Sequence, residues 1–118
     1  MDVLIVGGGP AGLMAAEAAS QAGLKVLVCD AMPSVGRKFL LAGKGGLNLT
    51  HSEPLDRFVQ RFSHGRVADW LEQLTPQQLR DWAQELGVET FVGTSGRVFP
   101  SEMKAAPLLR SWLRRLRA

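Results

Sequence analysis

The chain has 118 residues, of which 46% are hydrophobic and 21% are charged, and its formal net charge is +3. This length suits one small domain, and the weak positive charge is compatible with anionic ligands but does not argue for nucleic acid without a matching motif. The single cysteine excludes an internal disulfide framework, so we expect a cytoplasmic protein. No apolar stretch could span a membrane, and we expect neither a membrane nor a nucleic-acid partner.

The N-terminal segment combines a strand, a glycine turn and the start of a helix. Residues 3–6 are apolar and mostly β-branched, and Gly7, Gly9 and Gly12 match the dinucleotide fingerprint G-x-G-x-x-G. We expect Gly7 to permit a tight turn, Gly9 to let the backbone approach a pyrophosphate, and Gly12 to let helix and strand pack closely. The phosphates would lie at a helix N-terminus, which favours anions, and Pro10 suits the first helical turn.

A second strand and an acidic residue follow. A helix is predicted over residues 10–22, and residues 25–29 are predicted to form a buried parallel strand. Asp30 comes at the end of this strand, where a carboxylate can accept hydrogen bonds from adenosine ribose hydroxyls. Cys29, in an apolar strand, is expected to be packed and unreactive. This order predicts a mononucleotide-binding βαβ unit; a glycine-rich turn that serves only helix packing is the alternative.

The next stretch, residues 31–52, is polar and spaced by glycines. Residues 32–34 predict a turn, residues 36–41 a short helical turn and residues 43–46 a flexible loop. Loops of this length inside compact domains are usually functional or disordered. We therefore expect this stretch to belong to the ligand site.

The second part of the chain is predicted to be mainly helical, with one β-hairpin. Helices are expected over residues 55–62, 66–74, 76–86 and from 104 to the end, and strands over 89–92 and 97–99. Thr75 and Gln78 form a capping box before the third of these helices. Trp70 and Trp82 share helical spacings with leucines, and we interpret both as core residues. The arginines of the last helix are interpreted as a solvated face.

Together these elements predict an α/β fold with a Rossmann-like βαβ unit, a mainly helical segment and a short β-hairpin. We assign residues 1–52 to the βαβ unit with its cofactor loop, and residues 53–118 to the helices and hairpin. Only two long parallel strands are predicted, whereas a dinucleotide fold needs a third strand beside the second. We therefore expect an incomplete domain, the N-terminal portion of a longer protein.

Three motifs narrow the class of dinucleotide-binding protein. They are Gly-Gly-Gly-Pro-Ala-Gly at 7–12, the stretch 35–50 with Gly-Arg-Lys and Gly-Lys-Gly-Gly-Leu-Asn-Leu-Thr, and Gly-Arg-Val-Phe-Pro at 96–100. With this combination the chain resembles the N-terminal part of the BaiN/RdsA-type (YhiN-like) NAD(P)/FAD-dependent oxidoreductases. The resemblance covers essentially the whole chain, and it implies that the βαβ unit binds FAD.

The resemblance also implies which residues contact the cofactor. The glycine turn would hold the pyrophosphate, the acid after the second strand would hold the adenosine ribose, and the 35–50 stretch would lie along the cofactor towards the flavin. The implied residues are Gly7, Gly8, Gly9, Pro10, Ala11, Gly12, Asp30, Ala31, Arg37, Lys38, Gly43, Gly45, Gly46 and Asn48. The family usually has Glu in place of Asp30, and an Arg-Cys pair where this chain has Gly46 and Leu47. These departures concern the chemistry near the flavin more than cofactor binding.

We therefore predict the FAD-binding part of a flavin-dependent oxidoreductase, in which NAD(P)H is the electron donor and a small organic molecule is the acceptor. No catalytic residue and no metal site is predicted, since His51 and His64 lack partners at a recognisable spacing. One alternative is an NAD(P)-dependent dehydrogenase domain, for which Asp30 followed by the non-basic Ala31 would favour NAD. The other is a non-catalytic, truncated nucleotide-binding fragment.

Overall fold

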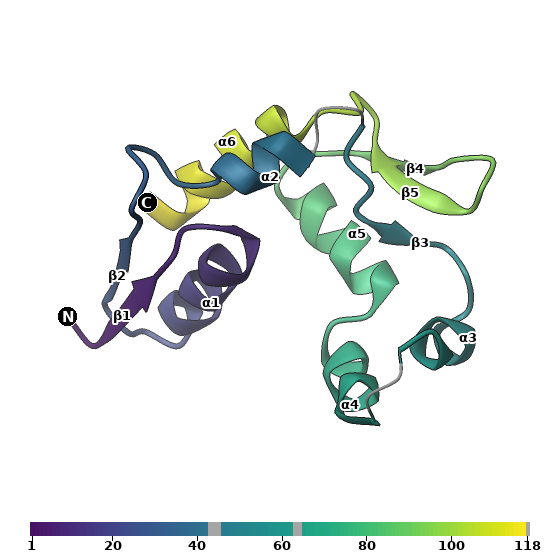
Figure 1. Cartoon of the computed structure of the whole chain (residues 1–118), viewed down its shortest axis with the longest axis horizontal. Coiled ribbons are helices and arrows are strands. Elements are labelled where there is room, and N and C mark those ends of the chain that lie inside the picture. The colour runs from purple at the N-terminus through teal and green to yellow at the C-terminus, as the bar shows by residue number, and fades with distance from the viewer. Residues whose placement is uncertain (43–45, 63–64, 118) are drawn as a thin grey trace.

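The computed structural model describes residues 1–42, 46–62 and 65–117. Its elements are β1 (Val3–Val6), α1 (Pro10–Gln21), β2 (Val26–Cys29), α2 (Arg37–Ala42), β3 (Thr50–His51), α3 (Leu55–Gln60), α4 (Gly65–Gln73), α5 (Pro76–Glu85), β4 (Thr90–Val92), β5 (Arg97–Pro100) and α6 (Ala105–Arg117). The βαβ unit lies at one side of the molecule and a small antiparallel sheet at the other, with α6 running between them (Figure 1). The predicted α/β class is confirmed, and the short strand β3 replaces part of the predicted loop.

The parallel sheet consists of β1 and β2, and α1 covers one of its faces (Figure 1). Leu4 pairs with Leu27 and Val6 with Cys29 in register. These four residues are exposed, Val6 by 83%, and as alternate residues of paired strands they share the other face of the sheet. The predicted parallel strand at residues 25–29 is thus confirmed as β2. The prediction that it is buried is wrong, and so is the expectation that Cys29 is packed, because the described residues cover one face only.

The core lies where α1, α2, α5 and α6 meet. Phe39 on α2 and Trp112 on α6 have ring centroids 6.2 Å apart, and Trp82 on α5 packs edge-on against Trp112 at 4.8 Å. Burial of side chains of this kind contributes about 1.5–3 kcal/mol each. Trp82 thus faces the core as predicted. The same prediction is wrong for Trp70, which is 61% exposed because α4 packs mainly against α3, outside this core.

One buried acidic side chain ties three of these helices together. Glu17 on α1 accepts hydrogen bonds from the indole Nε1 of Trp82 at 2.9 Å and from Nη1 of Arg115 at 3.2 Å. Since a buried carboxylate needs such partners, this network also fixes how α5 and α6 lie against α1. No helix within the described ranges is both long enough and apolar enough to cross a membrane.

The antiparallel sheet packs against α5 and has the strand order β3–β5–β4. α5 begins at the predicted capping box, in which Gln78 N–H donates to Thr75 Oγ1 at 3.1 Å and Thr75 N–H donates to Gln78 Oε1 at 2.9 Å. The hairpin of β4 and β5 is confirmed, and β3 adds to it by pairing Thr50 with Val98. This sheet holds the chain that leads out of the 46–49 segment towards α3.

Candidate functional site

Residues 7–12 form the turn between β1 and α1, and three glycines give it its shape. Gly7 has φ +105°, a region that side chains disfavour. A Cβ atom at Gly12 would lie 1.9 Å from the carbonyl oxygen of Gly7, so α1 approaches the turn more closely than any larger residue allows. At Gly9, by contrast, a Cβ atom would meet nothing within 4 Å. The turn is therefore tightly packed towards the protein and open at Gly9.

The N-terminus of α1 faces this opening. Gly9 is the N-cap of the helix, and its carbonyl oxygen accepts the first helical hydrogen bond, from Leu13 N–H at 2.9 Å. Pro10 has no N–H, and the N–H groups of Ala11 and Gly12 have no acceptor within the helix. These two donors and the positive end of the helix dipole form an environment that favours an anion.

Gly8 connects the turn with two later segments of the chain. Its N–H donates to Oδ2 of Asp30 at 2.7 Å, and its carbonyl oxygen accepts from Gly36 N–H at 2.7 Å. A Cβ atom at Gly8 would lie 2.5 Å from Cγ1 of Val35. The turn, the end of β2 and the start of α2 are thus joined at Gly8, a role that the glycine fingerprint does not predict.

Asp30 is exposed and carries a carboxylate whose position is set by the backbone. Met32 N–H donates to its Oδ1 at 2.9 Å, and Gly8 N–H donates to the other oxygen. These bonds, that from Met32 first, hold the pKa of Asp30 below its usual range, and the charge of Arg37 adds a smaller effect. Because a carboxylate offers about four lone-pair sites, both oxygens can still accept hydrogen bonds from ligand hydroxyls.

Two cavities lie close to the glycine turn. The cavity on the side of Asp30 has a volume of about 340 Å³ and a partly polar lining formed by Val28, Asp30, Met32, Pro33, Ser34, Val35, Leu113 and Arg117. The cavity on the side of Pro10 has a volume of about 440 Å³ and a mainly apolar lining formed by Pro10, Met14, Lys38, Phe39, Ala42, Leu47, Asn48, Leu49, Leu79, Trp82 and Trp112. The polar cavity is thus linked to the turn through Asp30, which is bonded to Gly8, and the apolar cavity through Pro10 of the turn itself.

The structure brings several predicted residues to these cavities. Pro10, Lys38 and Asn48 meet at the apolar cavity, although they come from three separate segments. Asp30 lines the polar cavity. Arg37 lies near the polar cavity, because its Nε donates a hydrogen bond at 3.2 Å to Oγ of Ser34, which lines that cavity.

Other predicted residues lie elsewhere. Ala31 adjoins Asp30 without lining either cavity. Gly46 has φ +118° and a Cβ atom there would lie 2.9 Å from Cε of Met103, so this position packs against the chain before α6. His51 hydrogen-bonds through Nε2 to the carbonyl oxygen of Ser95 at 3.2 Å, within the antiparallel sheet region. The predictions for Gly43, Gly45 and His64 fall outside the described residues.

Both cavities also include residues that sequence reasoning missed. Helix α6 contributes Trp112 to the apolar cavity and Leu113 and Arg117 to the polar one. The apolar periodicity of α6 indicated that one face is buried, but which cavity that face adjoins depends on tertiary packing. Arg117 is one of the arginines of the last helix for which the sequence predicts a solvated face.

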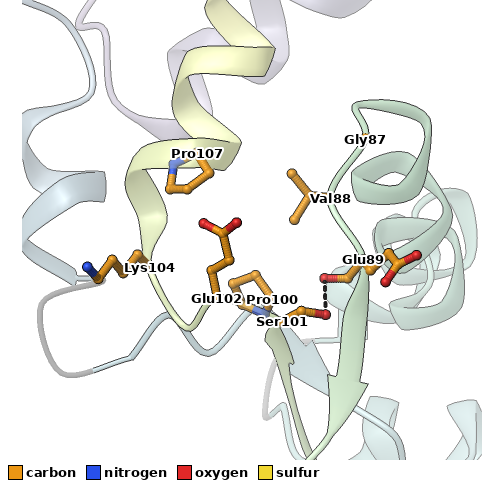
Figure 2. Close-up of a pocket in the computed structure, with 8 residues that line it drawn as sticks. All are labelled: Gly87, Val88, Glu89, Pro100, Ser101, Glu102, Lys104 and Pro107. Carbon is orange, nitrogen blue, oxygen red and sulfur yellow. Dashed lines mark hydrogen bonds between the residues drawn. The ribbon is translucent and has the colours of Figure 1, made fainter.

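A third cavity, of about 250 Å³, lies at the N-terminal end of α6 (Figure 2). Its lining consists of Gly87, Val88, Glu89, Pro100, Ser101, Glu102, Lys104 and Pro107. Figure 2 shows that the carboxylate of Glu102 extends between Val88 and Pro107, while Ser101 Oγ donates to the carbonyl oxygen of Glu89 at 3.2 Å. Within the described ranges no three His, Cys, Asp or Glu side chains could hold a metal. The glycine turn with its two cavities is therefore the candidate site.

Known proteins similar to this chain cover different lengths of it. A ribosomal RNA dihydrouridine synthase from Escherichia coli (strain K12) is 42% identical over 50 residues, which are 42% of this chain and 12% of that protein. Digeranylgeranylglycerophospholipid reductase 3 from Methanosphaera stadtmanae is 39% identical over 93 residues, 76% of this chain and 22% of that protein. Ferredoxin–NADP reductase 2 from Shouchella clausii is 33% identical over 93 residues, which are 79% of this chain and 26% of that protein.

The chain spans about a quarter or less of the length of these curated relatives. The model of the HI0933-like protein Rossmann domain matches residues 1–118, which is the whole chain. This match confirms the resemblance predicted from the glycine turn and from the 35–50 and 96–100 motifs. The chain therefore belongs to the HI0933-like Rossmann-domain family.

Proposed function

We propose that this chain is the FAD-binding part of a flavin-dependent oxidoreductase, with NAD(P)H as the electron donor and a small organic molecule as the acceptor. The observation that carries the proposal is that the glycine turn adjoins an apolar cavity through Pro10 and a polar cavity through Asp30, which is bonded to Gly8. A dinucleotide has the matching layout, because its pyrophosphate lies between two chemically different halves. The family membership and the two relatives named as reductases add support.

The residues present fit such a cofactor. The open space at Gly9 and the N–H groups of Ala11 and Gly12 would accommodate the pyrophosphate oxygens. Asp30, already oriented by two backbone amides, would accept hydrogen bonds from the adenosine ribose. The apolar cavity of about 440 Å³ suits the large isoalloxazine ring better than the smaller and more polar nicotinamide. This difference favours FAD over NAD as the bound cofactor.

FAD would supply the hydride and electron chemistry that side chains lack, and the protein would supply binding and orientation. Lys38 and Asn48 would donate hydrogen bonds to polar edges of the ligand in the apolar cavity. Leu47 and Trp82, which line the same cavity from separate segments of the chain, would exclude water from it. No described residue of this chain is assigned an acid–base step.

The substitution Gly9→Val tests this assignment. The backbone of Gly9 is extended (φ −82°, ψ −174°) and open space surrounds its Cβ position, so valine should fit without disturbing the fold. Its side chain would, however, occupy the space proposed for the phosphates. In a fluorescence titration we expect the unmodified chain to bind FAD and the variant to bind it about tenfold or more weakly.

The matched control is Ala15→Val, which places the same valine side chain at an exposed position of the same helix and should leave FAD affinity unchanged. Equal affinity of the Gly9 variant and the unmodified chain would contradict the phosphate assignment. Tighter binding of NAD than of FAD would favour the dehydrogenase alternative. A folded chain that binds neither dinucleotide would overturn the proposal in favour of a non-catalytic fragment.

A further inference from the structure

We propose that Arg117 of α6 forms a wall of the adenosine cavity and binds the adenine ring by stacking its guanidinium plane on the purine. The inference rests on the proposed dinucleotide function, and it adds a residue that specifies one half of the ligand. Arg117 follows the glycine turn by more than a hundred residues, so neither the fingerprint nor the 35–50 motif contains it.

The position of Arg117 beside the polar cavity is the first reason for this assignment. The polar cavity has one wall from the end of β2 and the turn after it, and a second wall from Leu113 and Arg117. These two residues are about one helical turn apart and lie on the same face of α6. Arg117 also lines the neighbouring gap between α6 and β2, and the C-terminal end of α6 lies near β2 in Figure 1.

The pairing of the charged side chains near the cavity is the second reason. Arg115, two residues away, is paired with Glu17 and Glu85, whereas no ion pair involves Arg117 among the residues that the structure describes. The Asp30 carboxylate is held by the amides of Gly8 and Met32 instead. The guanidinium of Arg117 is therefore available to a ligand, since the residue is exposed and lines the cavity.

The fit between adenosine and the lining of the cavity is the third reason. If Asp30 binds the ribose, the purine extends into the remaining cavity, whose lining includes Met32, Val35 and Leu113 as apolar contacts for a flat ring. A planar guanidinium stacks on aromatic rings, whereas a lysine ammonium is a compact point charge. A ribose 2′-phosphate would also attract an arginine, but the ionised Asp30 beside the ribose would repel that phosphate. Adenine is thus the group that suits both residues.

Calorimetric titration of the full 118-residue chain with ADP tests the inference. We expect Arg117→Gln and Arg117→Lys each to weaken ADP binding about threefold to tenfold, since lysine retains the charge but not the plane. Arg114→Gln removes the same charge from the same end of α6 without touching the cavity, and should bind ADP like the unmodified chain. Inorganic pyrophosphate, which lacks a purine, should bind equally to all four proteins.

Each other outcome has a definite meaning. Full affinity in Arg117→Lys would show a charge contact and overturn the stacking. A loss of affinity for adenosine 2′,5′-bisphosphate that exceeds the loss for ADP would make Arg117 a phosphate ligand and also overturn it. Unchanged ADP binding in Arg117→Gln would overturn this inference but not the proposed function. Failure of the unmodified chain to bind ADP would overturn both, and thermal unfolding would verify that every variant is folded.

Discussion

The backbone N–H of Gly8 and the carboxylate oxygen Oδ2 of Asp30 are 2.7 Å apart, although 22 residues separate them in the sequence. This hydrogen bond joins the glycine turn to the end of β2. The proposed pyrophosphate and ribose sites are therefore held in position relative to each other within the protein itself. Such preorganisation reduces the entropy that is lost when a ligand binds.

Asp30→Asn is expected to weaken ADP binding about tenfold. Asparagine has one acceptor oxygen, so it can satisfy the amide of Gly8 or that of Met32 but not both, and it offers fewer lone pairs to ribose. Calorimetry measures the change, with Asp69→Asn, an exposed acid on α4, as the control. Unchanged affinity would mean that Asp30 serves only to hold the turn.

Gly12→Ala is expected to destabilise the protein by about 2–4 kcal/mol. The added Cβ would lie 1.9 Å from the carbonyl oxygen of Gly7, which is backbone, so α1 must move away from β1. Gly9→Ala is the control, since its Cβ meets nothing and its cost should stay within about 1 kcal/mol. Urea unfolding of both variants provides the comparison. Equal stability of the two would contradict the close approach of α1 to the turn.

Acid should destabilise the fold in part through Glu53. The side chain of Arg61 hydrogen-bonds to Glu53 and holds the pKa of this carboxyl below its usual range. A carboxyl whose pKa is lower in the folded state contributes stability above its unfolded pKa and loses it as the pH falls through the folded value. We expect the melting temperature to fall below about pH 4, and to fall less steeply in Glu53→Gln. Identical pH profiles of the two proteins would show that this pair contributes nothing.

The exposed face of the parallel sheet should promote self-association. Leu4, Val6 and Leu27 form an apolar surface there, and contiguous apolar surface is a common cause of protein association. Val6→Thr keeps a β-branched side chain, and sedimentation should show less association at high protein concentration. Val92→Thr, on the exposed part of β4, is the matched control and should behave like the unmodified chain.

The βαβ half of the fold was predictable because its signals are local. Glycine spacing, a proline at the first helical turn and an apolar run each act within a few residues. β3 was not predictable in this way, since Thr50 and His51 become a strand only by pairing with β5. Trp70 shows a related limit: helical spacing indicates which residues share a face, but not whether another element covers that face.

The candidate site was predictable to a similar extent. The fingerprint and the acid after β2 located its centre, and the family resemblance added Lys38 and Asn48, which the structure places in one cavity. The joining role of Gly8 could not be inferred, because it depends on Asp30 and Gly36 folding back against it. The contribution of α6 depends in the same way on contacts between distant parts of the chain.

The exposure of Cys29 has a practical consequence. It is the single cysteine of the chain, its side chain is accessible, and it immediately precedes Asp30. A maleimide dye would therefore attach at one defined point, next to Asp30 in the sequence, with no need to introduce or remove a thiol. The arrival of an adenine nucleotide could then be followed optically, in real time, with the natural sequence.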